Sequence, residues 1–274
     1  MVPPTAVIFH AVEAIAPGVK PMTNASVAVA ATTFEGDFRV GRVLSRALSV
    51  FSRRFPTFFI VTLVAASPLI LMQMASPKPG TDPTQALLLV GITLVLFIVL
   101  LMLSMVSAAV VLHGTFQDMR QRPVSLIESL KVGLRRFLPL TGLALAGSLL
   151  QCIGFVLLVI PGLILYTMWF VSVAACVVER TGVWASLRRS KDLTKGHRWK
   201  IFGLGALILL LSFVNPVLQG PLKTAGGDTV ALIFTLIWTS LGSVFSSIVV
   251  AVTYYDLRAA KEGLDIEQIA SVFD

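Results

Sequence analysis

The chain has 274 residues, of which 56% are hydrophobic and only 13% are charged, and its formal net charge is +8. So few charged side chains cannot cover a water-soluble globule of this length, which argues against a soluble enzyme or a soluble nucleic-acid-binding domain. The composition predicts an all-α protein that lies largely in a membrane.

The first 36 residues are rich in Ala, Val and Pro, and no basic residues precede the first apolar stretch. Prolines this frequent interrupt helices, and a signal peptide needs a basic start, so residues 1–36 are predicted to form a disordered tail. An alternative hypothesis is that translation starts at Met22.

Five long runs without charged residues follow the tail. They begin after Arg54, Asp82, Arg136, Lys200 and Asp228 and are 23, 35, 42, 22 and 27 residues long. A helix needs about 20 residues to cross about 30 Å of hydrocarbon, so the run of 42 residues is long enough for two crossings. The sequence therefore predicts six transmembrane helices in a membrane domain at 37–256, followed by a tail at 257–274.

Local signals place several helix ends. Asp82 followed by Pro83 is typical of a helix start, and Pro161-Gly162 is predicted to form the turn between the third and fourth spans. The fifth span is expected to end near Asn215-Pro216, ahead of a polar loop that leads into the sixth span.

Three segments share a pattern in which a basic amphipathic helix precedes an apolar span. We call Val40–Ala66, Ser125–Gly147 and Val183–Leu211 the first, second and third basic segments. The second begins with a capping-box pattern, from Ser125 to Glu128. The amphipathic helices are expected to lie in the membrane interface and to end at Pro56, Pro139 and Gly196. Three such units in one orientation predict three helix-pair repeats around an axis along the membrane normal.

Charge predicts the orientation of these spans. If the N-terminus is cytoplasmic, the cytoplasmic segments carry 20 Lys and Arg residues and the external loops carry only Lys78 and Lys223. Because cytoplasmic loops of membrane proteins are rich in Lys and Arg, both termini are expected in the cytoplasm of a multi-pass protein of the bacterial inner membrane.

The third basic segment and its flanks resemble a known membrane module. The stretches around Pro161-Gly162, from Ala185 to Trp199 and from Tyr255 to Asp265 are similar to the membrane domain associated with bacterial glycerophosphoryl diester phosphodiesterases. The resemblance implies a six-helix module, without the catalytic barrel, that is associated with lipid-derived phosphodiesters.

Catalysis is not expected from this chain. Its three histidines have no acidic neighbour at metal-ligand spacing, and the sequence contains no hydrolase or nucleotide-binding motif. We therefore predict a protein without catalytic residues, metal or cofactor. A small-solute or lipid transporter is the alternative, because helices broken at Pro161 and Pro216 are compatible with a substrate path. The polar groups near the external ends of the spans, Gln73, Gln151, Asn215 and Gln219, are more simply explained as residues at the membrane interface.

Arginines beside the headgroup layer are the candidate functional residues. Each cation near an anionic membrane surface contributes about 1 kcal/mol, and Arg forms paired hydrogen bonds with phosphate oxygens. The sequence favours binding of anionic lipid headgroups, with a membrane-protein or enzyme partner and a homo-oligomer left open, and no nucleic acid as a ligand. The same charges could serve only to set topology. The lipid-headgroup candidates are Arg53, Arg54, Arg135, Arg136, Arg188, Arg189 and Arg198.

Overall fold

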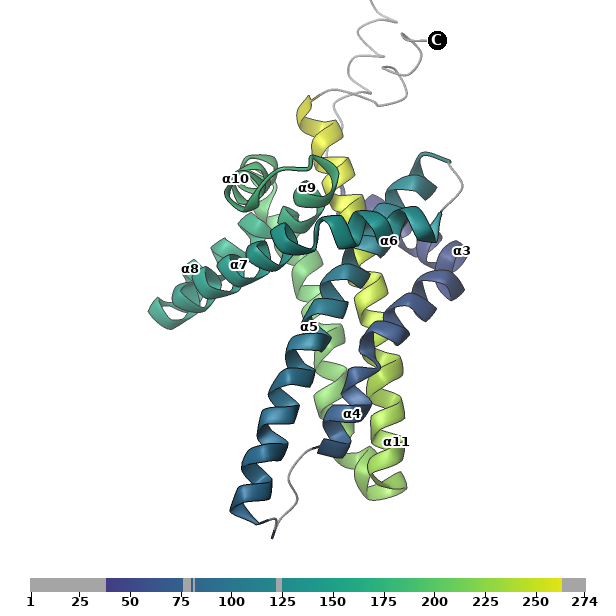
Figure 1. The fold of residues 1–274 in the computed structure, drawn as a ribbon. Helices are drawn as coiled ribbons and strands as arrows, with labels where there is room; N and C mark the ends of the chain where they lie inside the picture. The colour runs from purple at the N-terminus through teal and green to yellow at the C-terminus, as the bar shows by residue number, and fades with distance from the viewer. Residues whose placement is uncertain (1–37, 76–79, 81, 122–124, 263–274) are drawn as a thin grey trace, which may run out of the picture. The chain divides into compact units, whose positions relative to one another are not determined.

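A computed structural model describes residues 38–75, 80, 82–121 and 125–262, and all regular structure in these residues is helical (Figure 1). The predicted disordered tail at 1–36, the Met22 hypothesis and residues 263–274 lie outside the described residues. Helices carry the labels of Figure 1: α3 (Val40–Ala66), α4 (Pro68–Ala75), α5 (Pro83–Met119), α6 (Leu126–Arg135), α7 (Phe137–Leu157), α8 (Val159–Trp169), α9 (Ser172–Val178), α10 (Val183–Thr194) and α11 (Arg198–Glu262).

Five stretches of the described chain are long and apolar enough to cross a membrane. They are Val40–Ala75, Pro83–Met119, Phe137–Val156, Ile160–Val178 and Arg198–Glu262. The most apolar window of Pro83–Met119 contains no buried residue, so its Leu, Val and Ile side chains face outward. An outward apolar surface of this length is typical of a helix surrounded by lipid.

The longest stretch, α11, contains two helices joined at a kink. Gly227 has φ 76° and ψ −178°, which is outside the helical region. Figure 1 shows α11 turning back on itself, and side-chain hydrogen bonds join its arms. Trp238 Nε1 donates to the carbonyl of Leu211 at 2.9 Å, and Thr235 Oγ1 donates to Asn215 Oδ1 at 3.1 Å.

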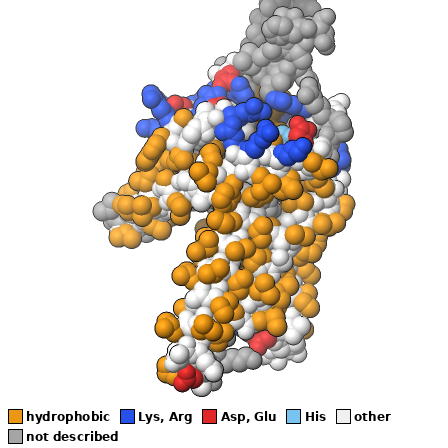
Figure 2. Space-filling view, viewed as in Figure 1, with side chains coloured by type: hydrophobic (Ala, Val, Ile, Leu, Met, Phe, Trp, Pro, Cys, Tyr) orange, Lys and Arg blue, Asp and Glu red, His pale blue; other side chains and the backbone are white. Residues whose placement is uncertain are grey.

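The buried core lies toward one end of these helices. It joins the first half of α3, the end of α5, α9, α10 and both ends of α11, with Val43, Leu112, Ala175, Ile201 and Ile248 fully or almost fully buried. Figure 2 shows Lys and Arg side chains gathered at this same end, over α6 and α10, with hydrophobic side chains covering the helices below. We call it the basic end.

The predicted break at Pro56 is wrong, because α3 continues through that residue to Ala66. A proline removes one backbone hydrogen bond and can bend a helix without ending it. Residues on both sides of Pro56 are buried, Val50 before it and Phe58 after it, so packing along the whole length holds α3 together.

Two predicted turns lie elsewhere along the chain. The turn between α7 and α8 falls at Leu158, which has extended backbone angles, and Pro161 sits in the first turn of α8, where its missing N–H leaves no bond unmade. The fifth span does not end at Asn215-Pro216, since α11 remains helical to Gly226. Within this segment Asn215 and Gln219 form hydrogen bonds with Thr235 of the second arm.

Other local predictions are confirmed. Asp82 caps α5 by accepting a hydrogen bond from Thr84 N at 3.1 Å, and Ser125 Oγ accepts from Glu128 N at 3.3 Å. Gly196, with φ 92°, follows the end of α10. The predicted boundary at residue 256 coincides with no break, because α11 runs on to Glu262.

Candidate anion-binding cavity

The first basic segment places two arginines on a buried carboxylate. Asp118, in the last turn of α5, has a side chain that is only 5% exposed. Arg54 Nε donates to Asp118 Oδ1 at 2.7 Å, and Arg53 Nη2 lies 3.1 Å from Asp118 Oδ2. About two turns earlier on α3, Arg46 Nη1 donates to Asp256 Oδ1 of α11 at 2.8 Å. These pairs fasten α3 to the ends of α5 and α11.

The third basic segment binds two carboxylates from outside it through Arg189. Its Nε donates to Glu179 Oε1 at 2.6 Å, and its Nη2 pairs with Glu262. Tyr254 donates to the same oxygen of Glu179 at 2.7 Å, and Arg258 donates to Glu262 at 2.7 Å. Burial opposes the charge of Arg189, but hydrogen bonds from its guanidinium to Glu262 and Glu179 outweigh that effect and raise its pKa.

The arginine pair of the second basic segment differs from the other two. Among the described residues, no carboxylate forms an ion pair with Arg135 or Arg136. Arg136 Nη1 donates instead to the backbone carbonyl of Arg180 at 3.3 Å. The charge of this pair is therefore not balanced by an acidic side chain in the part of the chain that the structure describes.

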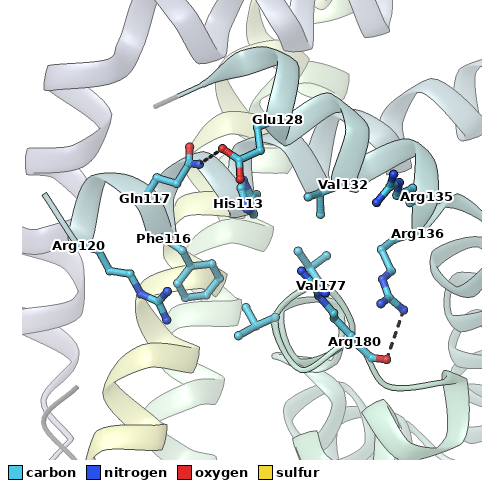
Figure 3. Close-up of a pocket in the computed structure, with 11 residues that line it drawn as sticks. His113, Phe116, Gln117, Arg120, Glu128, Val132, Arg135, Arg136, Val177 and Arg180 are labelled. Atoms are coloured by element: carbon cyan, nitrogen blue, oxygen red, sulfur yellow. Dashed lines mark hydrogen bonds between the residues drawn. The ribbon is translucent and has the colours of Figure 1, made fainter. Parts of the chain in front are cut away.

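Arg135 and Arg136 line a cavity of about 730 Å³ between the end of α5, α6 and the segment after α9 (Figure 3). The lining contains four arginines, one carboxylate, one histidine and an apolar floor. The residues are His113, Phe116, Gln117, Arg120, Glu128, Val132, Arg135, Arg136, Val177, Val178 and Arg180.

Local sequence features hold α6 against α5 beside this cavity. A Cβ atom on Gly133 would lie 3.2 Å from both a side-chain carbon and the carbonyl oxygen of Val106, so glycine allows the two helices to approach closely. One turn away, Ser129 Oγ lies 3.0 Å from His113 Nδ1. This contact gives His113 a hydrogen-bond partner on α6.

Arg180 reaches the cavity from an unusual backbone position. It directly follows Glu179, the C-cap of α9, with φ 55°, in the left-handed region that non-glycine residues seldom adopt. Its side chain projects into the cavity while its carbonyl accepts from Arg136 (Figure 3). Arg180, the residue after the C-cap of α9, thus contributes a guanidinium group to the cavity and a carbonyl that orients Arg136.

The cavity has the chemistry of a phosphate site. Guanidinium groups present planar sets of donors that match phosphate oxygens. Among the described lining residues, four carry a guanidinium group and one carries a carboxylate. The described residues contain no group of three or more His, Cys, Asp or Glu side chains that could hold a metal ion. The absence of catalysis stays a prediction.

The structure separates the seven predicted arginines into two groups. Arg135 and Arg136 line the cavity, whereas Arg53, Arg54 and Arg189 bind protein carboxylates. Arg188 is exposed on α10, and Arg198, at the start of α11, has a buried Nε without a hydrogen-bond partner among the described residues. None of these five lines the cavity with Arg135 and Arg136.

Sequence reasoning missed Arg120, Arg180, His113, Gln117 and Glu128 as lining residues. The signal that could have identified two of them is their place in the chain. Arg120 and Arg180 each lie within three residues of the end of an uncharged run, the runs that begin after Asp82 and Arg136. Cations at such positions meet the headgroup layer.

Comparison with protein-family models, with curated proteins and with solved structures finds no match to this chain.

Proposed function

We propose that this protein is a multi-pass module of the bacterial inner membrane that binds phosphate-bearing ligands, either phospholipid headgroups or glycerophosphodiesters, in the cavity lined by Arg135 and Arg136. A partner enzyme would process the ligand, since the sequence leads us to expect no catalysis from this chain. The resemblance to the membrane domain of glycerophosphoryl diester phosphodiesterases is part of this proposal.

The proposed topology has six crossings in three helix-pair units, with both termini in the cytoplasm. The five apolar stretches supply six crossings because each arm of α11, on either side of Gly227, exceeds about 20 residues. The gathering of Lys and Arg at the basic end supports a cytoplasmic position for that end.

Labelling of single cysteines tests this topology. In a background without Cys152 and Cys176, Asp228→Cys beside the α11 kink should react with a membrane-impermeant maleimide added to spheroplasts, and Lys131→Cys on α6 should react only after permeabilisation. Labelling of both positions from the same side would contradict the six-crossing arrangement.

One observation carries the proposed ligand class. Two of the three basic segments neutralise arginines with carboxylates of the protein, whereas Arg135 and Arg136 face a cavity that also holds Arg120 and Arg180. Clustered cations repel one another, and an anion in the cavity would offset that repulsion. Phosphate is an anion whose oxygens match the paired donors of a guanidinium group.

Lipid retention tests the proposal. The purified protein would be released from nanodiscs of mixed phospholipids into a native mass spectrometer, together with Arg135→Gln/Arg136→Gln. A matched control, Lys131→Gln/Lys191→Gln, removes two exposed cations from α6 and α10 that do not line the cavity. We expect wild type and control to retain phospholipid and the arginine variant to lose it; equal retention by all three would reduce Arg135 and Arg136 to topology signals.

A further inference from the structure

Among the described residues that line the cavity, Glu128 is the only carboxylate. Two hydrogen bonds between α5 and α6 connect Ser125 to the Glu128 carboxylate through Gln117. Ser125 N donates to Gln117 Oε1 at 3.2 Å, and Gln117 Nε2 donates to Glu128 Oε2 at 3.2 Å. The amide of Gln117 therefore orients the Glu128 carboxylate, as the dashed line in Figure 3 shows.

Glu128 and the arginine pair lie at different ends of the cavity. Seven residues separate Glu128 from Arg135 on α6, which is about two helical turns and about 10 Å along the axis. Figure 3 shows Glu128 with Gln117 and His113 on one side of the cavity and Arg135 with Arg136 on the other. Arg120 lies on the Glu128 side in the same view, so the cavity has a carboxylate and one arginine at that end and the arginine pair at the other.

This carboxylate is not used to neutralise its neighbours. Four arginines line the same cavity, but within the described ranges none of them forms an ion pair with Glu128. By contrast, Asp118, Asp256, Glu179 and Glu262 each bind at least one arginine. An oriented carboxylate without a protein cation can accept a cation from a ligand.

We infer that the ligand is a phosphodiester with an ammonium group on one ester arm, such as a phosphoethanolamine headgroup. Its phosphate binds Arg135, Arg136 and Arg180, and its ammonium binds Glu128. The inference rests on the proposed phosphate site and narrows its ligands from phosphate-bearing groups in general to those that also carry an ammonium group. A membrane phospholipid and a soluble glycerophosphodiester share this chemistry.

The first arm of the test uses soluble probes and the full-length protein in maltoside micelles. Calorimetric titration would compare glycerophosphoethanolamine with glycerophosphoglycerol, which has the same phosphodiester without the ammonium. Wild type should bind the ammonium probe at least tenfold more tightly. Glu128→Gln, whose amide oxygen can still accept from Gln117, should bind the two probes within about threefold of each other. Asp192→Asn removes an exposed carboxylate of α10 outside the cavity and should keep the wild-type preference.

The second arm identifies the source of the ligand. Nanodiscs of equal parts phosphatidylethanolamine and phosphatidylglycerol would supply both headgroups, and native mass spectrometry would measure which lipid stays bound. Selective retention of phosphatidylethanolamine supports the inference with a lipid ligand, and preference for the ammonium probe in the first arm alone supports it with a soluble one.

Two results would overturn the inference in distinguishable ways. If wild type binds both probes and both lipids equally, yet Arg135→Gln/Arg136→Gln loses them, the phosphate site stands and the role of Glu128 is wrong. If wild type and the arginine variant bind all ligands equally weakly, the proposed function fails too. The wild-type preference is measured without any variant, so misfolding of Glu128→Gln cannot mask the outcome.

Discussion

The first and second basic segments have similar sequences but their arginine pairs have different surroundings. Arg53-Arg54-Phe55 and Arg135-Arg136-Phe137 look like copies of one motif. In the structure the first pair binds the buried carboxylate of Asp118, whereas the second lines an open cavity and has no acidic partner among the described residues. A shared motif therefore attaches helices at one position and lines a cavity at another.

The third basic segment sharpens this comparison because neighbouring arginines in it differ. Arg189 is bound by Glu179 and Glu262, but Arg188 is exposed beside it on α10. Whether an arginine forms an ion pair within the fold or stays exposed depends on the carboxylates that other helices bring near it, and not on its own motif.

The largest expected effect is on Arg189. Arg189→Gln leaves Glu179 and Glu262, both mostly buried, without their shared cation and should lower the free energy of unfolding by about 3 kcal/mol. Urea unfolding in detergent measures the change. Arg188→Gln, the matched control, should change it by less than about 0.5 kcal/mol; equal effects would remove the distinction between neighbouring arginines.

A smaller loss is expected for Arg54→Gln. Asp118 would keep Arg53 but lose its hydrogen bond from Arg54 Nε, so stability should fall by about 2 kcal/mol. Arg135→Gln removes the corresponding charge from the second basic segment and should have little effect on unfolding. A destabilisation by Arg135→Gln as large as that by Arg54→Gln would mean that Arg135 supports the fold.

These pairs also show what sequence could and could not reveal. The apolar runs, the caps at Asp82 and Ser125 and the stop at Gly196 were predictable because they depend on neighbouring residues. The continuation of α3 through Pro56 was not, because tertiary packing on both sides of the proline overrides its local effect.

Only part of the candidate site could be predicted from the sequence, for the same reason. Arg135 and Arg136 could be proposed from their motif, but the partners that exclude Arg54 and Arg46 from the site lie 64 and 210 residues away in sequence. No local pattern connects those positions. Arg180 and Glu128 become site residues only when α9 and α6 are brought beside α5.

The cap of α6 is expected to contribute about 1 kcal/mol. Ser125→Ala removes the side-chain acceptor for Glu128 N, leaving that N–H without its cap, and should lower stability by this amount. Ser125→Asp restores an acceptor and should recover most of the loss in the same unfolding assay. No difference between the Ala and Asp variants would show that the cap contributes nothing to stability.

The smallest effect is on Arg180. Arg180→Asn removes one guanidinium from the cavity and places a residue that tolerates left-handed backbone at φ 55°, so phosphodiester affinity should fall about threefold without loss of stability. Gln121→Asn is the control, because Gln121 has the same φ but does not line the cavity. Equal affinities for both variants would exclude Arg180 from the site.

The most direct test of the account compares the three arginine pairs in one experiment. Arg53→Gln/Arg54→Gln, Arg135→Gln/Arg136→Gln and Arg188→Gln/Arg189→Gln would be measured for retained phospholipid by native mass spectrometry and for thermal unfolding midpoint. We predict that only the Arg135/Arg136 variant loses phospholipid at an unchanged midpoint, and that the other two lose several degrees of stability but keep the lipid while folded. Loss of phospholipid from all three variants in equal measure would contradict the assignment of the binding site to the second basic segment.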